Sequence, residues 1–307
     1  MDRGLVSVII NCRNSEKYLS QCIDSVLIQT YTNYELIVVD NKSNDKTKTI
    51  IKSYNDSRIK YYYLKTKLNL GGARNFALKK SKGKYIAFID SDDIWLDDKL
   101  DKTVNKFSKG IGLIYSDVEY FNETSSFRLY NSRKLYKGDI FNNLLYDYNL
   151  CMSSCVVDSE VISKNNLQFD ENLKVCEDLD FFLKITYLSK VDYSLDVLVK
   201  YRIHNNNLTS KYHNLFFDEF ELTINNLVNY FNLDKDYFVK AMDYNYIKKA
   251  RYFWRNNKIK EAFSSLNMIK KLFFHRVFYS CIILIPFSLV LFLYKPFTGI
   301  KIRFNEN

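Results

Sequence analysis

Residues 83–93 read Gly-Lys-Tyr-Ile-Ala-Phe-Ile-Asp-Ser-Asp-Asp, and this stretch decides the class of fold. The run from Tyr85 to Ile89 is continuously apolar and is followed by Asp90. A continuous apolar run is typical of a strand in a parallel sheet that is covered on both faces. A second run of the same kind, Glu35-Leu-Ile-Val-Val-Asp40, lies upstream. In parallel sheets, ligands bind beyond the carboxyl ends of the strands. We therefore expect Asp40 and Asp90 to lie at a ligand-binding edge.

Strand-like and helix-like segments alternate through roughly the first hundred residues. Strands are expected at 5–10, 35–40, 58–64 and 84–90, with helices after Ser15, after the turn 41–45 and over 71–80. Ser15 is expected to cap the first of these helices. Such alternation is typical of βαβ units. It predicts an α/β fold with a mostly parallel sheet flanked by helices.

The alternation weakens beyond Gly110. Strands are expected at 111–121, 153–157 and 191–203, an irregular segment at 122–149, and an amphipathic helix at 177–188. Past about residue 211 the pattern is helical and rich in aromatic residues. The sequence thus predicts an α/β domain over 1–210 and a helical C-terminal region over 211–307.

The composition indicates a globular protein, with 47% hydrophobic and 26% charged residues and a net charge of +10. Positive charge favours acidic partners such as nucleic acid, diphosphates or an anionic membrane. The basic residues are scattered and form no recognisable nucleic-acid module, so a diphosphate or a membrane surface is preferred. The six cysteines show no disulfide or zinc spacing, and Cys151 and Cys155 read as two small buried residues. No signal peptide is expected, and a reducing cytosol is the expected compartment.

Two clusters of carboxylates stand out. Asp90-Ser-Asp92-Asp93 places three of them in four residues, which suits a hard divalent cation such as Mg²⁺ or Mn²⁺. Capping of a following helix explains the same residues without a ligand. Glu177-Asp178-Leu179-Asp180 opens a predicted helix, where acidic residues also favour the helix dipole. The functional interpretation makes one of these carboxylates a general base toward an acceptor hydroxyl.

Three further residues are candidates for binding. His204 lies in Tyr201-Arg-Ile-His204 and is one of three histidines. Arg74 and Asn75 lie in Gly71-Gly-Ala-Arg-Asn75 at a predicted helix start, where backbone N–H groups and a guanidinium favour phosphates. A structural histidine and a glycine turn beside a surface arginine are the simpler alternatives.

Taken in order, these segments resemble the family-2 glycosyltransferases over about the first two-thirds of the chain. The bacterial branch that builds surface polysaccharides or glycolipids is the most similar. The segments that carry the resemblance are Ser7-Val-Ile-Ile10, Asn14, Tyr18-Leu19, Ser25-Val-Leu-Ile-Gln-Thr-Tyr31, Glu35-Leu-Ile-Val-Val-Asp40, Asn69-Leu-Gly-Gly-Ala-Arg-Asn75, Gly83-Lys-Tyr-Ile-Ala-Phe-Ile-Asp-Ser-Asp-Asp93, Glu177-Asp178 and Tyr201-Arg-Ile-His204.

The resemblance implies a GT-A fold and an inverting sugar transfer from a nucleotide-sugar donor to a hydroxyl group. It implies a divalent metal, Mn²⁺ or Mg²⁺, held by Asp90, Asp92 and His204, with Asp92 as the direct ligand. Asp178, paired with Glu177, is implied as the catalytic base. The residues implied in donor binding are Arg13, Asn14, Asp40, Asn41, Arg74, Asn75, Asp90 and Ser91.

Two positions depart from the family pattern. The family often has Pro-Thr-Tyr-Asn after the first strand, whereas this chain has Asn11-Cys-Arg-Asn14. Arg13 replaces the aromatic residue expected to stack on the base, and a guanidinium can stack or pair with phosphate. The frequent Asp-Asp pair after the second strand is Asp40-Asn41 here, and an amide donates as well as accepts. Both changes concern the donor base, for which UDP is our default.

An uncharged apolar run, 277–294, lies near the end of the chain and is interrupted by Pro286. Its 18 residues are barely enough for a membrane span. Basic residues on both sides leave its orientation undefined: Lys270, Lys271, Arg276, Lys295, Lys301 and Arg303. We expect an interfacial or re-entrant anchor at the cytoplasmic face of the inner membrane, with a true span or a buried helical pair as alternatives. A lipid-linked acceptor would suit such an enzyme.

Three other functions remain to be distinguished. A sugar nucleotidyltransferase would need a glycine-rich phosphate loop, but residues 11–17 contain no glycine. A non-catalytic scaffold of the same fold would not need both carboxylate clusters. A dinucleotide-dependent dehydrogenase is disfavoured because the motif G-x-G-x-x-G is missing. Sequence alone leaves the donor sugar, the acceptor and the oligomeric state open.

Overall fold

The computed structural model describes residues 3–131, 133–205, 207–285 and 287. The chain divides into two compact units, Met1–His204 and Asn205–Asn307. This division lies a few residues before the boundary predicted after residue 210. The main sheet belongs to the first unit, and the second unit consists of helices in its described part.

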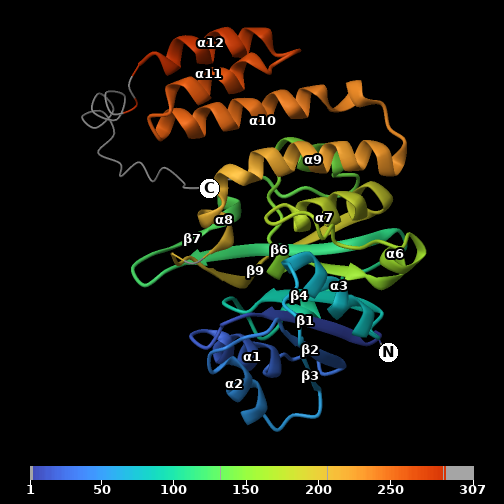
Figure 1. The fold of residues 1–307 in the computed structure, drawn as a ribbon. Helices are drawn as coiled ribbons and strands as arrows, with labels where there is room; N and C mark the ends of the chain where they lie inside the picture. The colour runs from blue at the N-terminus through green and yellow to red at the C-terminus, as the bar shows by residue number, and fades with distance from the viewer. Residues whose placement is uncertain (1–2, 132, 206, 286, 288–307) are drawn as a thin grey trace. The chain divides into compact units, whose positions relative to one another are not determined.

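The first unit is built on a mixed sheet (Figure 1), whose described strands run in the order β3-β2-β1-β4-β8-β6-β9-β5, with β7 paired to β6. The strands are β1 (Val6–Cys12), β2 (Tyr34–Asp40), β3 (Ile59–Tyr63), β4 (Tyr85–Asp90), β5 (Ile94–Trp95), β6 (Ile111–Phe121), β7 (Ser126–Arg128), β8 (Val156–Asp158) and β9 (Lys190–Arg202).

Helices follow the strands along the first unit and make up the second. In the first unit they are α1 (Leu19–Leu27), α2 (Thr47–Ser53), α3 (Leu70–Lys80), α4 (Lys99–Val104), α5 (Phe141–Tyr146), α6 (Ser159–Lys164) and α7 (Glu177–Leu188), with short 3₁₀ turns at Leu129–Asn131 and Met152–Ser154. In the second they are α8 (Leu208–Lys211), α9 (His213–Phe231), α10 (Lys235–Arg255), α11 (Ile259–Asn267) and α12 (Phe273–Ile283).

The first four strands are parallel, as predicted, and their ends meet at one edge. Strand β1 pairs with β2 and with β4, so that Cys12 lies opposite Asp40 and Asn11 lies opposite Asp90. Beyond β4 the sheet is mixed, because β8 runs antiparallel to both β4 and β6 while β6 and β9 are parallel. The α/β class is thus confirmed, and Asp40 and Asp90 lie at the ends of β2 and β4, the two strands that flank β1.

Apolar residues at alternating strand positions and at helical spacing make the core of this half. Val8, Ile10 and Val38 are fully buried, and α1 covers them with Leu19, Cys22, Ile23 and Val26. Each such side chain contributes about 1.5–3 kcal/mol when it is fully removed from water. The strand ends are therefore held on a rigid base, which suits them to position catalytic groups.

Three local expectations are corrected. Ser15 does not cap the first helix, since α1 begins at Leu19 without a side-chain cap; its hydroxyl lies 2.9 Å from the Ser91 hydroxyl instead. Asp93 is followed by the short strand β5, and the next helix begins only at Lys99. The strand expected at 153–157 begins at Val156, after a 3₁₀ turn.

Helix α7 is also different from the expected amphipathic helix. Most of its residues are buried, including Phe181 and Phe182 at 0% exposure. It contacts α5, α6, β6 and β9, so that neighbours cover it on several sides. Its first turn, which carries Glu177 and Asp178, is consequently held in a densely packed environment.

The second unit has its own small core, to which α10, α11 and α12 contribute Ala250, Ala262 and Ile283. Asp243 of α10 fixes the turn between α11 and α12, because its buried carboxylate accepts hydrogen bonds from the backbone N–H groups of Lys270, Lys271 and Leu272. None of the helices in the described ranges is long and apolar enough to cross a membrane. Within the predicted apolar run, residue 286 and residues 288–294 lie outside the described residues.

Candidate active site

The three carboxylates after β4 have different environments. Asp93 is 1% exposed, and its two oxygens accept hydrogen bonds from the Ser153 hydroxyl at 2.5 Å and the Arg202 backbone N–H at 2.9 Å. The side chains of Asp90 and Asp92 are 39% and 26% exposed. Asp93 therefore holds the turn in place, and Asp90 and Asp92 are the carboxylates available to a ligand.

His204 lies beside Asp92, as the predicted metal set requires. Its Nε2 atom is 2.8 Å from Asp92 Oδ2, and its ring lies 5.2 Å from the Tyr18 ring. The two residues are far apart in sequence and meet because β9 ends next to the turn after β4. A carboxylate and an imidazole at this distance can share a proton or a cation.

Arg202 secures this corner, a role that its place in Tyr201-Arg-Ile-His204 did not indicate. Its Nε donates to the backbone oxygen of Asp92 at 2.9 Å, and its Nη2 donates to Gln21 Oε1 at 2.6 Å. The guanidinium also lies 4.3 Å from the centre of the Tyr18 ring. Arg202 thus joins β9, the carboxylate turn and α1.

Arg74 connects the two carboxylate clusters. Its Nη1 donates to Glu177 Oε1 at 2.5 Å and its Nη2 donates to Asp90 Oδ1 at 3.2 Å, with the Arg74 side chain 5% exposed. The predicted contact of Arg74 with a diphosphate stays a prediction. In the structure Arg74 is a buried cation shared between the end of β4 and the start of α7.

Glu177 and Asp178, the two residues predicted to supply the base, differ in burial: Glu177 is buried and Asp178 is more accessible. Glu177 is 3% exposed, and burial raises its pKa to about 7 while Arg74 opposes the rise. Asp178 is half-buried; its Oδ1 accepts from the Leu179 backbone N–H at 2.7 Å. Burial raises the pKa of Asp178 too, against the effect of Arg74. Asp178 is therefore better placed to meet an acceptor, and Glu177 to orient Arg74.

Tyr148 is a residue of the candidate site that the sequence did not indicate. Its hydroxyl donates to Asp178 Oδ2 at 3.1 Å. The loop that carries it is held by Arg133, whose Nη1 donates to the Tyr148 backbone oxygen at 3.1 Å, and by the Tyr130 hydroxyl, which donates to the next carbonyl at 2.9 Å. Burial raises the pKa of Tyr148 well above its ordinary value, so it stays a donor near neutral pH.

The variant Tyr148→Phe tests this contact. We expect kcat to fall about tenfold with donor affinity unchanged, because a hydrogen bond to a charged group contributes about 1.5–3 kcal/mol. Loss of a donor to the ionised carboxylate raises the pKa of Asp178, so the acid limb of the kcat profile should move to higher pH. Tyr237→Phe, which removes a hydroxyl from a half-exposed residue of α10, is the control. An unchanged pH profile would contradict a role in orienting Asp178.

Asp40 and Asn41 shape the loop beyond β2. Asp40 is fully buried; its oxygens accept from the Ser43 backbone N–H at 2.8 Å and from the Tyr61 hydroxyl at 3.1 Å. The Asn41 amide donates to the Leu68 carbonyl and accepts from the Leu68 N–H, both at 2.9 Å. Their predicted contact with the donor base stays a prediction, and both side chains already support the walls of that region.

Arg13, Asn14 and Ser91 lie at the same edge, beyond β1 and β4. Arg13 and Asn14 are exposed, and Asn14 has a left-handed backbone with φ of 51°. The Asn14 side-chain oxygen accepts from the Asn44 backbone N–H at 3.0 Å, which ties the loops after β1 and β2 together. Arg13 is thus an accessible cation at the carboxyl edge of the sheet, and its predicted contact with a donor stays a prediction.

Asn75 has a structural environment that the sequence did not indicate. It is buried, its Nδ2 donates to the Phe169 carbonyl at 2.9 Å and to Glu171 Oε1 at 3.0 Å, and its Oδ1 accepts from the Phe169 N–H at 2.8 Å. Gly71 allows α3 to approach residues 169–171 closely, since a Cβ at this position would lie 2.9 Å from the Asp170 carbonyl oxygen. The glycines and Asn75 therefore pack α3 against residues 169–171.

The residues predicted to bind a metal fit the protein's share of a divalent-cation site. Within the described ranges no group of three or more His, Cys, Asp or Glu side chains is arranged to hold an ion by itself. Mg²⁺ and similar ions, however, are commonly held by one or two carboxylates together with substrate phosphates. Burial raises the pKa of Asp90; Arg74 opposes the rise, while the charges of Asp92 and Asp178 reinforce it. A cation would relieve this repulsion.

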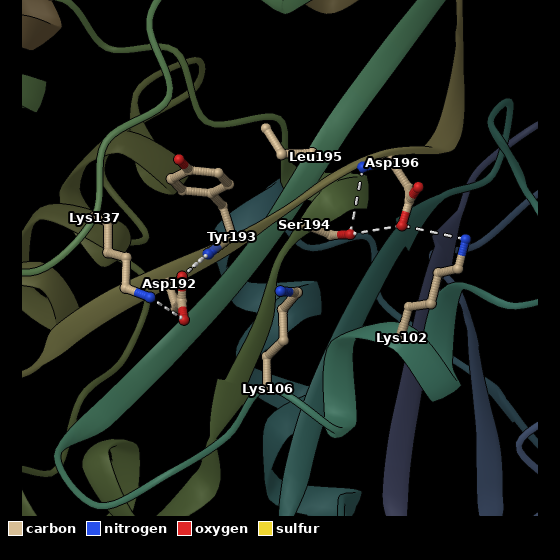
Figure 2. A pocket seen from close by; sticks show the side chains of 8 residues that line it. All are labelled: Lys102, Lys106, Lys137, Asp192, Tyr193, Ser194, Leu195 and Asp196. Atoms are coloured by element: carbon tan, nitrogen blue, oxygen red, sulfur yellow. Dashed lines mark hydrogen bonds and ion pairs between the residues drawn. The ribbon is translucent and has the colours of Figure 1, made fainter.

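A separate hollow lies between α4 and β9, with a volume of about 470 Å³ (Figure 2). It shares no residue with the predicted site. Four of its five charged groups form ion pairs: Lys137 Nζ lies 2.8 Å from Asp192 Oδ2, and Lys102 Nζ lies 3.2 Å from Asp196 Oδ2. We therefore interpret this hollow as a largely ion-paired surface, and the candidate site remains the one at the ends of β1, β2 and β4.

The sheet, its carboxylate turn and the acidic start of α7 together define a GT-A type sugar-transferring domain. The chain belongs to glycosyl transferase family 2, whose model matches residues 7–161. The match covers β1 to β4 and the turn with Asp90 and Asp92. It ends before Glu177 and His204, whose placement rests on the structure.

Known proteins agree with this assignment. The Escherichia coli enzyme UDP-Glc:alpha-D-GlcNAc-diphosphoundecaprenol beta-1,3-glucosyltransferase WfgD is 43% identical over 126 residues, which are 41% of this chain and half of that protein. The crystal structure of S. aureus TarS 1–349 in complex with UDP-GlcNAc matches with a TM-score of 0.68 at 20% identity. The match covers 86% of this chain and 81% of the TarS chain. The mannosyltransferase PcManGT from Pyrobaculum calidifontis, with GDP-Man and Mn²⁺, has a TM-score of 0.61 at 14% identity, covering 95% and 81%.

Proposed function

We propose that this transferase is an inverting, metal-dependent hexosyl- or N-acetylhexosaminyltransferase that uses a nucleotide-sugar donor, by default a UDP-sugar. One observation carries the proposal. Arg74 bridges Asp90 and Glu177, and so ties the carboxylate cluster that we propose for the metal diphosphate to the acidic pair that contains the proposed base, Asp178. A scaffold would have no use for two carboxylate clusters joined by one buried cation.

The residues support a single displacement at the anomeric carbon. Asp178 takes the proton of the acceptor hydroxyl while the oxygen of that hydroxyl forms the new bond to the anomeric carbon. The bond from the carbon to the donor diphosphate breaks, and the diphosphate leaves with the electron pair. Attack from the opposite face inverts the configuration. Tyr148 and the Leu179 N–H hold the carboxylate during this step.

A divalent cation bound by Asp92 with Asp90 and His204 would neutralise the charge that develops on the leaving diphosphate. Arg13 is the accessible cation for the donor phosphates or base, in place of the aromatic residue common in the family. The side chains of Asp40 and Asn41 support the region in which the base would lie.

For the acceptor, we propose a saccharide or a lipid-linked saccharide of bacterial surface-polysaccharide or glycolipid synthesis, reached at the cytoplasmic face of the inner membrane. The similarity to WfgD, whose name gives a diphosphoundecaprenol acceptor, supports the lipid-linked class. A screen of nucleotide sugars with Mn²⁺ or Mg²⁺ tests the reaction, and NMR of the product's anomeric proton tests inversion. Absence of both transfer and donor hydrolysis across the panel would favour the scaffold alternative.

The variant Asp92→Ala tests the metal assignment. We expect it to abolish the tightening of UDP binding by Mn²⁺, because Asp92 is the accessible carboxylate next to His204. Isothermal titration calorimetry measures the affinity with and without the ion. Asp97→Ala, which removes an exposed aspartate from the loop before α4, is the matched control and should bind as the wild type does. Equal UDP affinity of the wild type with and without Mn²⁺ would overturn the assignment.

A further inference from the structure

Helix α12 has an apolar stripe that is exposed among the described residues of its own unit. Phe273, Phe274, Val277 and Phe278 are 61%, 86%, 47% and 60% exposed. Leu284, just beyond the helix, is 71% exposed. At about 100° per residue these positions fall within an arc of about 140° on one side of the helix axis. An exposed apolar surface of this kind marks an interaction site.

The stripe is distinct from the face with which α12 packs into the second unit. Tyr279, Ile282 and Ile283 point the other way and contact the core made with α10 and α11. Figure 1 shows α12 beside α11. Asp243 anchors the turn that leads into the helix. The helix therefore carries two apolar faces, one of them packed and one exposed.

The charge around the stripe is positive. Lys270 and Lys271 are exposed where the chain enters α12, and Arg276 lies on the helix itself. The sequence has no aspartate or glutamate between Glu261 and Glu306. Two aspartates lie close to these lysines, because Lys271 Nζ donates to the Asp236 backbone oxygen at 3.2 Å and the buried Asp243 carboxylate accepts from the Lys270 and Lys271 backbone N–H groups. Aromatic side chains beside a surplus of basic groups are complementary to the interface of an anionic bilayer.

We propose that the exposed face of α12 docks on an anionic lipid surface. Phe273, Phe274 and Phe278 enter the boundary between headgroups and acyl chains, and Lys270 and Lys271 pair with lipid phosphates. The helix lies in the plane of the surface. This contact surface begins upstream of the run 277–294 that the sequence singled out. This docking surface rests on the proposed location at the membrane and specifies which residues make the contact. It does not depend on the donor, the acceptor or the mechanism.

Vesicle co-sedimentation of the full chain tests the proposal. The protein should bind vesicles that contain phosphatidylglycerol more tightly than vesicles of phosphatidylcholine alone, and salt should weaken the binding. The double variant Phe274→Ser, Phe278→Ser should lower the partition coefficient at least about tenfold, since each ring loses its apolar burial. Ile28→Ser, which removes an apolar side chain of 64% exposure from the end of α1, is the matched control.

Two other occupants of the stripe give different results. If the stripe joins two copies of the chain, sedimentation velocity will show a dimer that the double variant dissociates, and vesicles will not bind. If another segment of the chain covers it, the indole introduced by Phe274→Trp will resist quenching by acrylamide without vesicles; the native Trp95 and Trp254 are buried and give a low background. Either result overturns the proposal. Donor hydrolysis by the double variant should equal that of the wild type, so a failure here is distinct from a failure of the proposed reaction.

Discussion

Asp178→Asn is expected to lower kcat for sugar transfer by about 10²–10⁴-fold while donor affinity stays unchanged. The amide keeps the shape of the side chain and the contact with Tyr148 but cannot take the proton of the acceptor. Asp178 is the half-buried member of its pair, whereas Glu177 is engaged with Arg74. Steady-state transfer kinetics measure kcat, and calorimetry with UDP measures donor binding.

Asp180→Asn is the matched control for this variant. Asp180 lies on the same first turn of α7, but it is fully buried and its Oδ2 accepts from Lys184 Nζ at 2.6 Å. We expect the control to lose stability and to keep its kcat at a temperature where it is folded. Near-normal turnover in Asp178→Asn would remove Asp178 from the role of base, and Glu177 would be the next residue to test.

Arg74→Met is expected to lower the free energy of unfolding by about 3–5 kcal/mol, because it leaves the carboxylate of Glu177 buried without a partner. The Glu177 side chain is 4% exposed, so water cannot replace the guanidinium. Urea denaturation followed by circular dichroism measures the loss. Arg58→Met breaks the partly exposed pair with Asp56 and should cost only about 0–1 kcal/mol.

A second change separates the charge effect from the loss of packing. In Arg74→Met, Glu177→Gln both buried charges are gone, and we expect part of the stability to return. Arg74→Lys keeps the charge but cannot make the two-sided contact, and serves if Arg74→Met does not fold. Equal losses in Arg74→Met and Arg58→Met would show that the buried bridge does not stabilise the fold.

The sequence predicted the parallel strands β1, β2 and β4 because each is a continuous, mostly apolar run. The strand expected at 35–40 is Tyr34–Asp40, and the one at 111–121 is Ile111–Phe121. The short strands β5 and β8 were less predictable, since three residues such as Val156–Asp158 have too little pattern to define a strand. Their positions depend on pairing with β9, β4 and β6, which is tertiary information.

The location of the candidate site was predictable for a similar reason. Which of its carboxylates are buried and which are accessible was not predictable. Strands that end in an aspartate deliver carboxylates to one edge, and this rule placed Asp40 and Asp90. Nothing in Asp90-Ser-Asp92-Asp93 distinguishes the buried carboxylate from the accessible ones. Ser153 and Arg202 make that distinction, and they come from distant parts of the chain. Tyr148 had no signal, because it is one of many tyrosines in an irregular loop.

The hydrogen bonds to Asp93 also determine at what stage of synthesis the carboxylate turn can adopt its native conformation. Its partners lie 60 and 109 residues downstream, in Ser153 and Arg202. During synthesis, β1 to β4 can pair as soon as they emerge, because their contacts are local compared with these. The turn lacks its fixed form until β9 has been made and has docked, since long-range contacts close last. A chain interrupted before β9 therefore carries the sheet and the aspartates of a transferase without the geometry of one.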